Sequence, residues 1–240
     1  MTTTKRMQLR TALAIFLCHG IVLVAHSISK LVRVVRRKDF GYKKVSVSSE
    51  LRTLVVSAPY VSGRWLATYL DPIEQAFPGI RIIVVANPLH PLPEIFETVT
   101  PSSRLTTAIG ADLARAVMLF SAAIRNRADV ILGLHLELHG LLCLIVGRLT
   151  NASTWYFNIG GIAEIAGGGV AGGQRLFQMA SVPSRKLEQR LLGVISEFDI
   201  VLSMGSSTRR YFEAAGITRP IFDVGVGVGV GDDCRCSALS

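Results

Sequence analysis

Apolar residues alternate between short continuous runs and longer stretches with helical spacing from residue 51 onward. Short apolar runs bounded by Gly, Pro or polar residues are typical of strands buried on both faces, whereas apolar residues three and four apart indicate helices. This pattern predicts strands at 51–57, 80–86, 129–133, 154–157 and 199–203. It predicts helices at 64–77, 106–127, 135–148, 185–197 and 206–215, and a proline-rich loop at 87–103.

This alternation predicts an α/β fold, a Rossmann-like parallel sheet with helices on both faces. Strands separated by helices form βαβ units, and the sheet that they build is covered on both sides. In such folds ligands bind at the carboxyl ends of the strands, where loops and helix N-termini expose backbone N–H groups. Four loops are predicted at that edge: 59–63, 133–140, 158–169 and 204–207.

An uncharged segment, residues 11–29, precedes this domain between Arg10 and Lys30. A signal peptide is disfavoured, because no clear small-x-small cleavage motif is present and a strongly basic flank follows. A helix lying in the membrane plane is an alternative, since residues 30–38 continue with apolar residues between the charges. We favour a single membrane-spanning helix, because about 20 apolar residues cross a bilayer core.

Positive charge is concentrated beside this segment. Residues 1–50 contain ten Lys and Arg against two acids, whereas the other 190 residues contain 16 basic and 15 acidic groups. Because most of the basic residues follow the uncharged segment, the folded domain is expected to be membrane-associated on the cytoplasmic side, beside anionic lipid. The folded part lacks basic patches with interleaved aromatic residues, so no nucleic-acid partner is predicted.

The four cysteines have the spacing of neither a disulfide framework nor a metal site. Cys18 and Cys143 lie in apolar runs and are expected to pack as small hydrophobic residues. The pattern fits a reducing compartment. We predict no metal ion and no cofactor.

The most informative motif is a glycine cluster after the strand predicted at 154–157. Residues 160–169 contain five glycines and one acid, Glu164. Such a cluster indicates a backbone that turns sharply or approaches a ligand closely. The alternative is a flexible surface loop, with Glu164 as a capping or solvent-facing acid.

The order of the motifs resembles the amino-terminal half of GT-B-fold glycosyltransferases of family 4, over about residues 50–225. The resemblance rests on the motif Gly160-Gly161-x-x-Glu164-x-x-Gly167-Gly168-Gly169, followed by residues 187–195 and 198–206. The runs 54–59 and 129–131 fall where this half of the family would place its first strand and its mid-domain strand. The family implies a two-domain enzyme whose first domain binds the acceptor and whose second binds a nucleotide sugar. The chain departs from the family in two respects. Asn158 lies near where members often have a His-Gly pair, and the paired glutamates of the donor domain are not found in it.

On this resemblance the chain divides into three parts: a membrane-anchor helix with a basic collar (1–48), a glycosyltransferase N-terminal Rossmann-like domain (49–225) and a truncated linker or tail (226–240). The implied function is transfer of a sugar from a nucleotide-sugar donor to a lipid-linked or polysaccharide acceptor at the cytoplasmic membrane face. Because the donor-binding domain is not recognised in the chain, its status as an enzyme stays open.

Two other functions compete with this one. The chain could be a non-catalytic membrane-anchoring subunit that recruits a separate donor-binding chain. It could also be another Rossmann-like binding protein, although the absence of G-x-G-x-x-G after the first strand argues against a dinucleotide.

The candidate acceptor-binding residues come from the four loops at the predicted carboxyl edge, and no catalytic residue is predicted. They are Ser62, Gly63, His135, Asn158, Gly160, Gly161, Glu164 and Ser206. Glu164 is expected to accept hydrogen bonds from sugar hydroxyls. His135 and His139 are four residues apart on a predicted helix; a metal site would need a third ligand, so acceptor contact or packing is favoured. For Ser206, which precedes the last helix, N-capping is favoured over catalysis.

Overall fold

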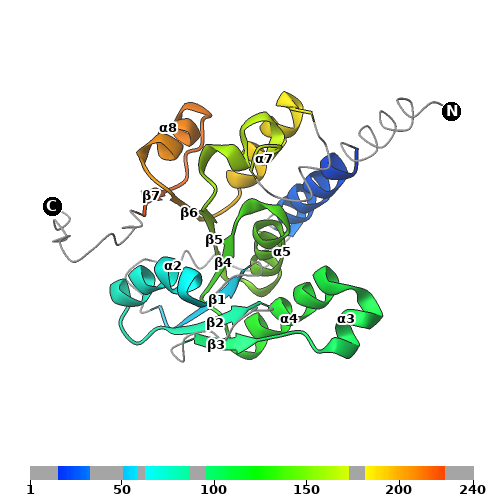
Figure 1. The fold of residues 1–240 in the computed structure, drawn as a ribbon, viewed down its shortest axis with the longest axis vertical. Coiled ribbons are helices and arrows are strands. Elements are labelled where there is room, and N and C mark those ends of the chain that lie inside the picture. The colour runs from blue at the N-terminus through cyan, green and yellow to red at the C-terminus, as the bar shows by residue number, and fades with distance from the viewer. Residues whose placement is uncertain (1–15, 33–50, 59–62, 87–95, 173–181, 225–240) are drawn as a thin grey trace.

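The computed structural model describes residues 16–32, 51–58, 63–86, 96–172 and 182–224. Seven strands form one sheet in the order β3-β2-β1-β4-β5-β6-β7 (Figure 1), and each neighbouring pair is parallel. The predicted α/β fold is therefore confirmed. The strands are β1 (Thr53–Ser57), β2 (Arg81–Val85), β3 (Phe96–Val99), β4 (Val130–Leu134), β5 (Ser153–Asn158), β6 (Ile200–Ser203) and β7 (Ile221–Asp223).

Helices alternate with most of these strands along the chain. They are α2 (Gly63–Ala76), α3 (Ser103–Ile109), α4 (Ala111–Arg125), α5 (Leu141–Thr150), α7 (Arg185–Ile195) and α8 (Ser206–Ala214). A π-helical turn, η1 (Leu136–Gly140), precedes α5, and two short 3₁₀ turns, η2 (Gly161–Glu164) and η3 (Ala166–Gly168), follow β5. A further helix, called here the N-terminal helix, occupies residues 16–32.

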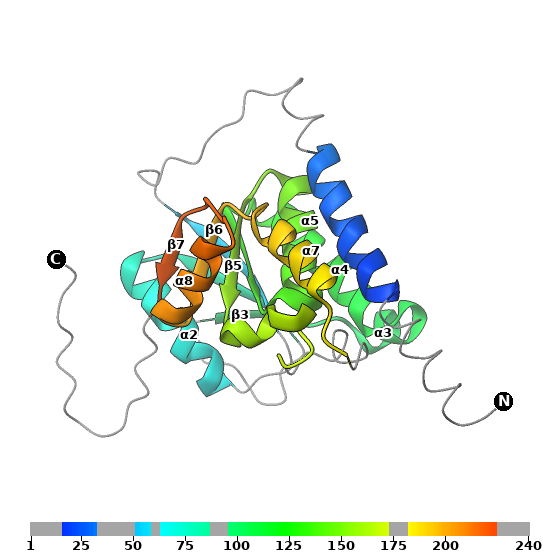
Figure 2. The same cartoon turned by 90° about the horizontal axis from the view of Figure 1, so that it is seen from above.

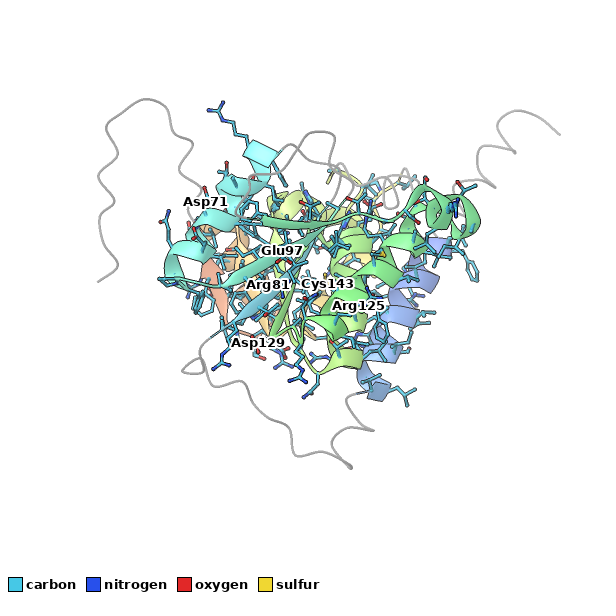
Figure 3. The ribbon with its side chains drawn as sticks, turned by 90° about the horizontal axis from the view of Figure 1, so that it is seen from below. Asp71, Arg81, Glu97, Arg125, Asp129 and Cys143 are labelled. Atoms are coloured by element: carbon cyan, nitrogen blue, oxygen red, sulfur yellow. The ribbon has the colours of Figure 1, made fainter. Side chains whose placement is uncertain are left out.

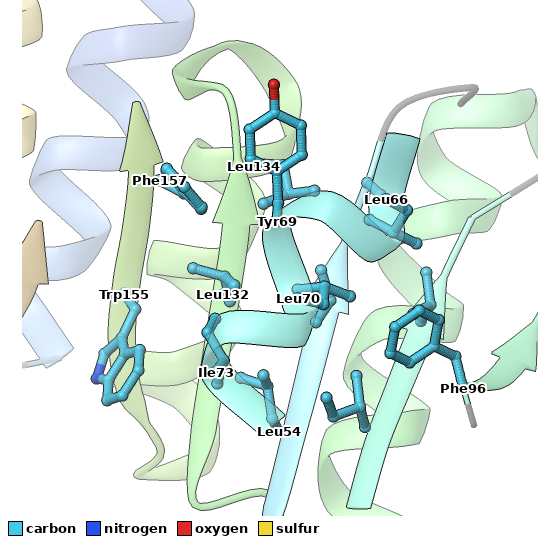
Figure 4. Packing of buried hydrophobic residues seen from close by; sticks show 14 of the residues in the cluster. Leu54, Leu66, Tyr69, Leu70, Ile73, Phe96, Leu132, Leu134, Trp155 and Phe157 are labelled. Carbon is cyan, nitrogen blue, oxygen red and sulfur yellow. The ribbon is translucent and has the colours of Figure 1, made fainter. Parts of the chain in front are cut away.

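The two faces of the sheet have different cores. Because side chains alternate along a strand, Val55 and Val56 of β1 point to opposite faces and belong to different clusters. On one face α2 packs Leu66, Leu70 and Ile73 onto the strands (Figure 4). On the other face lie α4, α5 and α7 (Figure 2). The strand order reverses at β1, between β2 and β4, which is the switch point where open α/β sheets bind ligands.

The N-terminal helix forms a third layer outside α5 and α7 (Figure 2). Its buried residues Cys18, Val22 and Ala25 recur at intervals of four and three, so they form one seam. This seam joins the core that contains Leu144 of α5 and Leu191 of α7. Among the described residues, no helix combines the length and the apolar character that crossing a membrane requires.

Cys18 and Cys143 pack as the sequence predicted. Both are buried in apolar clusters with free thiols. Burial raises the pKa of each thiol, which favours the uncharged form. Cys234 and Cys236 lie outside the described residues.

Three predictions of local structure were wrong. The loop predicted at 87–103 contains the edge strand β3, whose Phe96 alone is buried and whose Glu97 forms an ion pair with Arg81 of β2 (Figure 3). The helix predicted at 106–127 is broken at Gly110, which has a φ of 84° and separates α3 from α4. The sequence pattern also missed β7, which is too short to show a period.

Candidate functional site

The described loops that follow β4, β5 and β6 meet at the carboxyl edge of the sheet. His135 follows β4, and its backbone N–H donates to the carbonyl of Phe157 in β5 at 3.1 Å. Residues 160–169, called here the glycine loop, follow β5. In this loop Gly161 lies beside Thr208 of α8. The structure thus brings His135, Asn158, Gly160 and Glu164 into one hydrogen-bonded cluster.

Glu164 is the centre of this cluster and is fully buried. Its Oε1 accepts hydrogen bonds from Gly160 N at 2.9 Å and from His135 Nδ1. Its Oε2 accepts from Tyr156 Oη, from Asn158 Nδ2 at 3.2 Å and from Leu136 N at 3.3 Å. A buried carboxylate is stable only when donors surround it, and here both oxygens are engaged by the chain itself. Glu164 therefore holds the loops after β4 and β5 together.

His135 has an unusual backbone conformation. The prediction that it opens a helix was wrong, because its φ of 66° and ψ of 150° lie in a region that is almost reserved for glycine. Its side chain is 23% exposed and stacks on Trp65 of α2, with ring centroids 6.3 Å apart. Because Nδ1 is engaged by Glu164, Nε2 is the ring nitrogen available to a ligand.

Tyr156 and Asn158 complete the cluster from β5. Burial, and then the Glu164 carboxylate, raise the pKa of Tyr156 well above its ordinary value, so the hydroxyl stays protonated and donates to Glu164. Asn158 is fully buried, and its Nδ2 donates to Tyr156 Oη at 2.8 Å. Its Oδ1 has no hydrogen-bond partner within the described part of the chain. A buried acceptor of this kind is commonly satisfied by a ligand or a water molecule.

The glycine loop is shaped around Glu164. A Cβ atom at Gly160 would lie 2.7 Å from Glu164 Cγ, so no side chain fits between the loop and the carboxylate. Gly161 has a φ of 64°, which disfavours residues with a side chain. Gly160 therefore has a structural reason, the close packing of the backbone on a buried acid.

The remaining predicted residues lie at helix starts. Gly63 is the first residue of α2, two residues before Trp65, while Ser62 lies outside the described residues. The N-cap prediction for Ser206 was wrong: the cap position is taken by Gly205, with a φ of 86°, and Ser206 is the exposed first residue of α8.

His139 has a different role from His135. It is buried, and its Nδ1 lies 3.1 Å from the Ser57 hydroxyl of β1, so it fastens η1 to the sheet. Burial is the main cause that lowers its pKa to about 3, followed by the charges of Arg115 and His135. Within the described segments, no three His, Cys, Asp or Glu side chains gather as a metal site.

We expect His139 to make the protein sensitive to acid. Its pKa is about 3 in the folded state and 6.5 when exposed, so below pH 6.5 the unfolded chain takes up a proton that the folded protein does not. The free energy of unfolding should therefore fall by about 1.4 kcal/mol per pH unit between these values. Between pH 7 and about pH 5, the free energy of unfolding of the wild type should therefore fall by about 2 kcal/mol on account of His139. His139→Asn, which can still hydrogen-bond Ser57, should lack this part of the fall when both proteins are measured by urea titration. If the free energy of unfolding fell equally with pH in the wild type and in His139→Asn, His139 would not be the source of the acid sensitivity.

No protein-family model and no curated protein matches the chain. Among solved structures, it is similar to a crystal structure of UDP-N-acetylglucosamine 2-epimerase, at 11% identity and a TM-score of 0.46, over 72% of this chain and 48% of that one. A second is a complex of a UDP-glucosyltransferase from Polygonum tinctorium capable of glucosylating indoxyl, at 9% identity and a TM-score of 0.41, over 79% and 56%. The chain spans about half the length of these proteins. Membership of glycosyltransferase family 4 stays a prediction.

Proposed function

We propose that the chain is the acceptor-binding half of a glycosyltransferase that acts on a lipid-linked or polysaccharide acceptor at the cytoplasmic membrane face. The observation that carries this proposal is the strained backbone of His135 at the carboxyl edge of the sheet. Such a conformation costs about 1–3 kcal/mol and persists where the position of a side chain matters. Here it sets an imidazole between a buried carboxylate and an indole.

This arrangement suits a hydroxyl group. An acceptor hydroxyl can donate a hydrogen bond to His135 Nε2, while the Trp65 ring offers an apolar platform of the kind that lines ligand pockets. The unpaired Asn158 Oδ1 is buried and can accept a hydrogen bond from a bridging water. Glu164, the Gly160 backbone and Tyr156 act as positioning groups that hold these residues in place.

The same geometry supports proton transfer in the complete enzyme. The acceptor oxygen would form a bond to the anomeric carbon of the nucleotide sugar, and the bond from that carbon to the diphosphate would break. The hydroxyl proton would pass to His135 Nε2, and the adjacent Glu164 carboxylate would stabilise the resulting imidazolium. Charged and dipolar groups of a donor-binding domain would stabilise the leaving diphosphate.

A groove beside α2 favours association with such a donor-binding unit. It measures about 360 Å³ and is lined by Phe77, Trp155, Leu202, Phe222 and Val224 among other apolar side chains. Within the described residues, α2 is the helix that covers this face, and Phe222 at the β7 end of the groove is 53% exposed. Since parallel sheets are normally covered on both faces, a further domain or a separate donor-binding chain would complete it.

The test is binding of defined saccharides to the whole chain. Probes are cello-oligosaccharides and glucose linked to geranyl diphosphate, measured by calorimetry with wild type and His135→Gly. Glycine fits the backbone conformation of residue 135, so the variant removes the ring without straining the fold. We expect affinity to fall about tenfold, which corresponds to the loss of one hydrogen bond of about 1.4 kcal/mol.

Arg81→Gln serves as the control, because Arg81 begins β2 at the opposite edge of the sheet and is half exposed. Its affinity should match wild type. The proposal fails if no probe binds the wild-type chain, or if His135→Gly binds as tightly as Arg81→Gln.

A further inference from the structure

One helix, α4, is apolar on its outer side as well as its inner side. Its inner side contributes Leu119, Ala122 and Ala123 to the core. The outer side presents a stripe at intervals of four, three and four residues, each 39–62% exposed: Leu113, Val117, Phe120 and Ile124. This spacing places the stripe along one line of the helix, where a globular protein normally carries polar residues.

The N-terminal helix adds a second apolar stripe. One flank faces α7, since Arg190 donates to the backbone carbonyl of His19 and the His26 ring lies near Gly193. The opposite flank carries an exposed stripe, Leu17, Ile21, Val24 and Leu31. The N-terminal helix lies beside α5 and α4 (Figures 2 and 3), and Leu149 of α5 is a further exposed apolar residue. Together we call these nine residues the apolar helical face.

The charges around this face have one prevailing sign. On the N-terminal helix, α3, α4 and the turn after α4, the exposed bases are Lys30, Arg104, Arg125 and Arg127. The one exposed acid among these described residues is Asp112, 3.7 Å from the Arg115 guanidinium. In sequence the N-terminal helix is also flanked by basic runs, with ten Lys and Arg against two acids over residues 1–50.

We infer that the apolar helical face docks on an anionic lipid bilayer, with the N-terminal helix and α4 lying in the plane of the interface. The inference rests on the proposed function and names the surface through which that membrane association occurs. Two exposed apolar stripes on neighbouring helices favour an apolar partner, and exposed basic residues on the same elements match phosphate headgroups. A second copy of the chain would bring like charges together, so the charge pattern disfavours a symmetric dimer through this face.

The docking geometry differs from a spanning anchor. An interfacial helix buries its apolar side to a depth of about 5–10 Å and keeps its charges among the headgroups. The buried seam of the N-terminal helix packs against the protein, and its exposed apolar stripe stays free to contact lipid. The folded domain would then rest on the membrane directly, with its helical layer against the lipid.

The experiment compares two aspartate substitutions at exposed phenylalanines. Phe120→Asp lies on the apolar helical face, at 39% exposure, and Phe222→Asp lies in the groove on the other face of the sheet, at 53%. Co-sedimentation uses vesicles of phosphatidylcholine with and without phosphatidylglycerol. We expect Phe120→Asp to bind the anionic vesicles at least about tenfold more weakly than wild type, because it removes an inserted ring and adds a repelled charge. Phe222→Asp should bind like wild type, and phosphatidylcholine alone should bind all three proteins weakly.

A fluorescent label gives a second readout. Phe120→Cys, combined with Cys234→Ser and Cys236→Ser, carries an environment-sensitive dye, since Cys18 and Cys143 are buried. Its emission should shift to the blue with anionic vesicles.

Wild-type binding by Phe120→Asp, or an unshifted dye, would overturn the inference and leave the basic residues of segment 1–50 as the membrane contact. Dissociation of a dimer by Phe120→Asp in gel filtration would overturn it in favour of a second copy. Saccharide calorimetry reads the proposed function separately, so the two can fail independently.

Discussion

Glu164→Leu is expected to lower the free energy of unfolding by about 3–5 kcal/mol and to abolish acceptor binding. Leucine fills a similar volume but accepts no hydrogen bond. The donors around the buried carboxylate would then lose this acceptor: His135 Nδ1, Tyr156 Oη, Asn158 Nδ2 and the backbone N–H groups of Leu136 and Gly160. Unpaired buried donors are the costly outcome when one partner of a network is removed. Urea denaturation followed by circular dichroism measures the loss.

Glu213→Leu provides the matched control. Glu213 also pairs with a cation, Arg209, but the pair is about half exposed and lies along one side of α8. Exposed pairs contribute little, so this variant should unfold close to wild type. If Glu164→Leu unfolded at the same urea concentration as Glu213→Leu, the carboxylate would not be the centre of the cluster.

Arg148→Met is expected to lower the free energy of unfolding by about 3 kcal/mol while leaving acceptor binding intact. Arg148 is buried at the end of α5, where its guanidinium contacts Asp199 at 3.4 Å and donates to the Glu197 carbonyl. Asp199 in turn accepts from the backbone and hydroxyl of Thr154 at 2.9 Å each. Removal of the cation takes the Arg148 counter-charge away from that carboxylate. The site lies at the opposite edge of the sheet, so the saccharide affinity of the folded protein should not change.

A double-mutant cycle separates the ion pair from the packing of the arginine stem. Arg148→Met, Asp199→Asn and the double variant are compared by urea denaturation. The double variant should be more stable than the sum of the single losses implies, because it leaves no uncompensated charge. Strictly additive losses would show that the two residues act independently.

The strands with continuous apolar runs were predictable because their signal is local. Val55 and Ile83 are buried on a sheet covered at this point by helices on both sides, so the whole run must be apolar. The edge strand β3 gives no such signal, since Glu97 and Thr98 are exposed and only Phe96 is buried. The break at Gly110 was missed for a related reason: one glycine within a helical pattern is compatible with either continuity or a boundary.

Only part of the candidate site could be predicted from the sequence. The glycine cluster and its acid stand out by composition, but the pairing of His135 with Glu164 spans 29 residues and depends on β4 lying beside β5. No local pattern contains that adjacency. Tyr156 could have been found, since the period of two along a strand places it on the same face as Asn158. The strain at His135 had no signal, because nothing in the sequence marks a histidine that adopts a conformation typical of glycine.

The packing of the N-terminal helix has a consequence for synthesis of the chain. Arg190 of α7, whose side chain contacts the carbonyl of His19, follows it by 171 residues. At about 5–20 residues per second, the ribosome needs roughly 9–34 s to make that stretch. For this time the seam of Cys18, Val22 and Ala25 has emerged without the α7 residues that later cover it. A nascent chain that exposes an apolar helix with a basic flank can bind chaperones or anionic lipid. The N-terminal helix can therefore contact the membrane before the domain that later covers it has been synthesised.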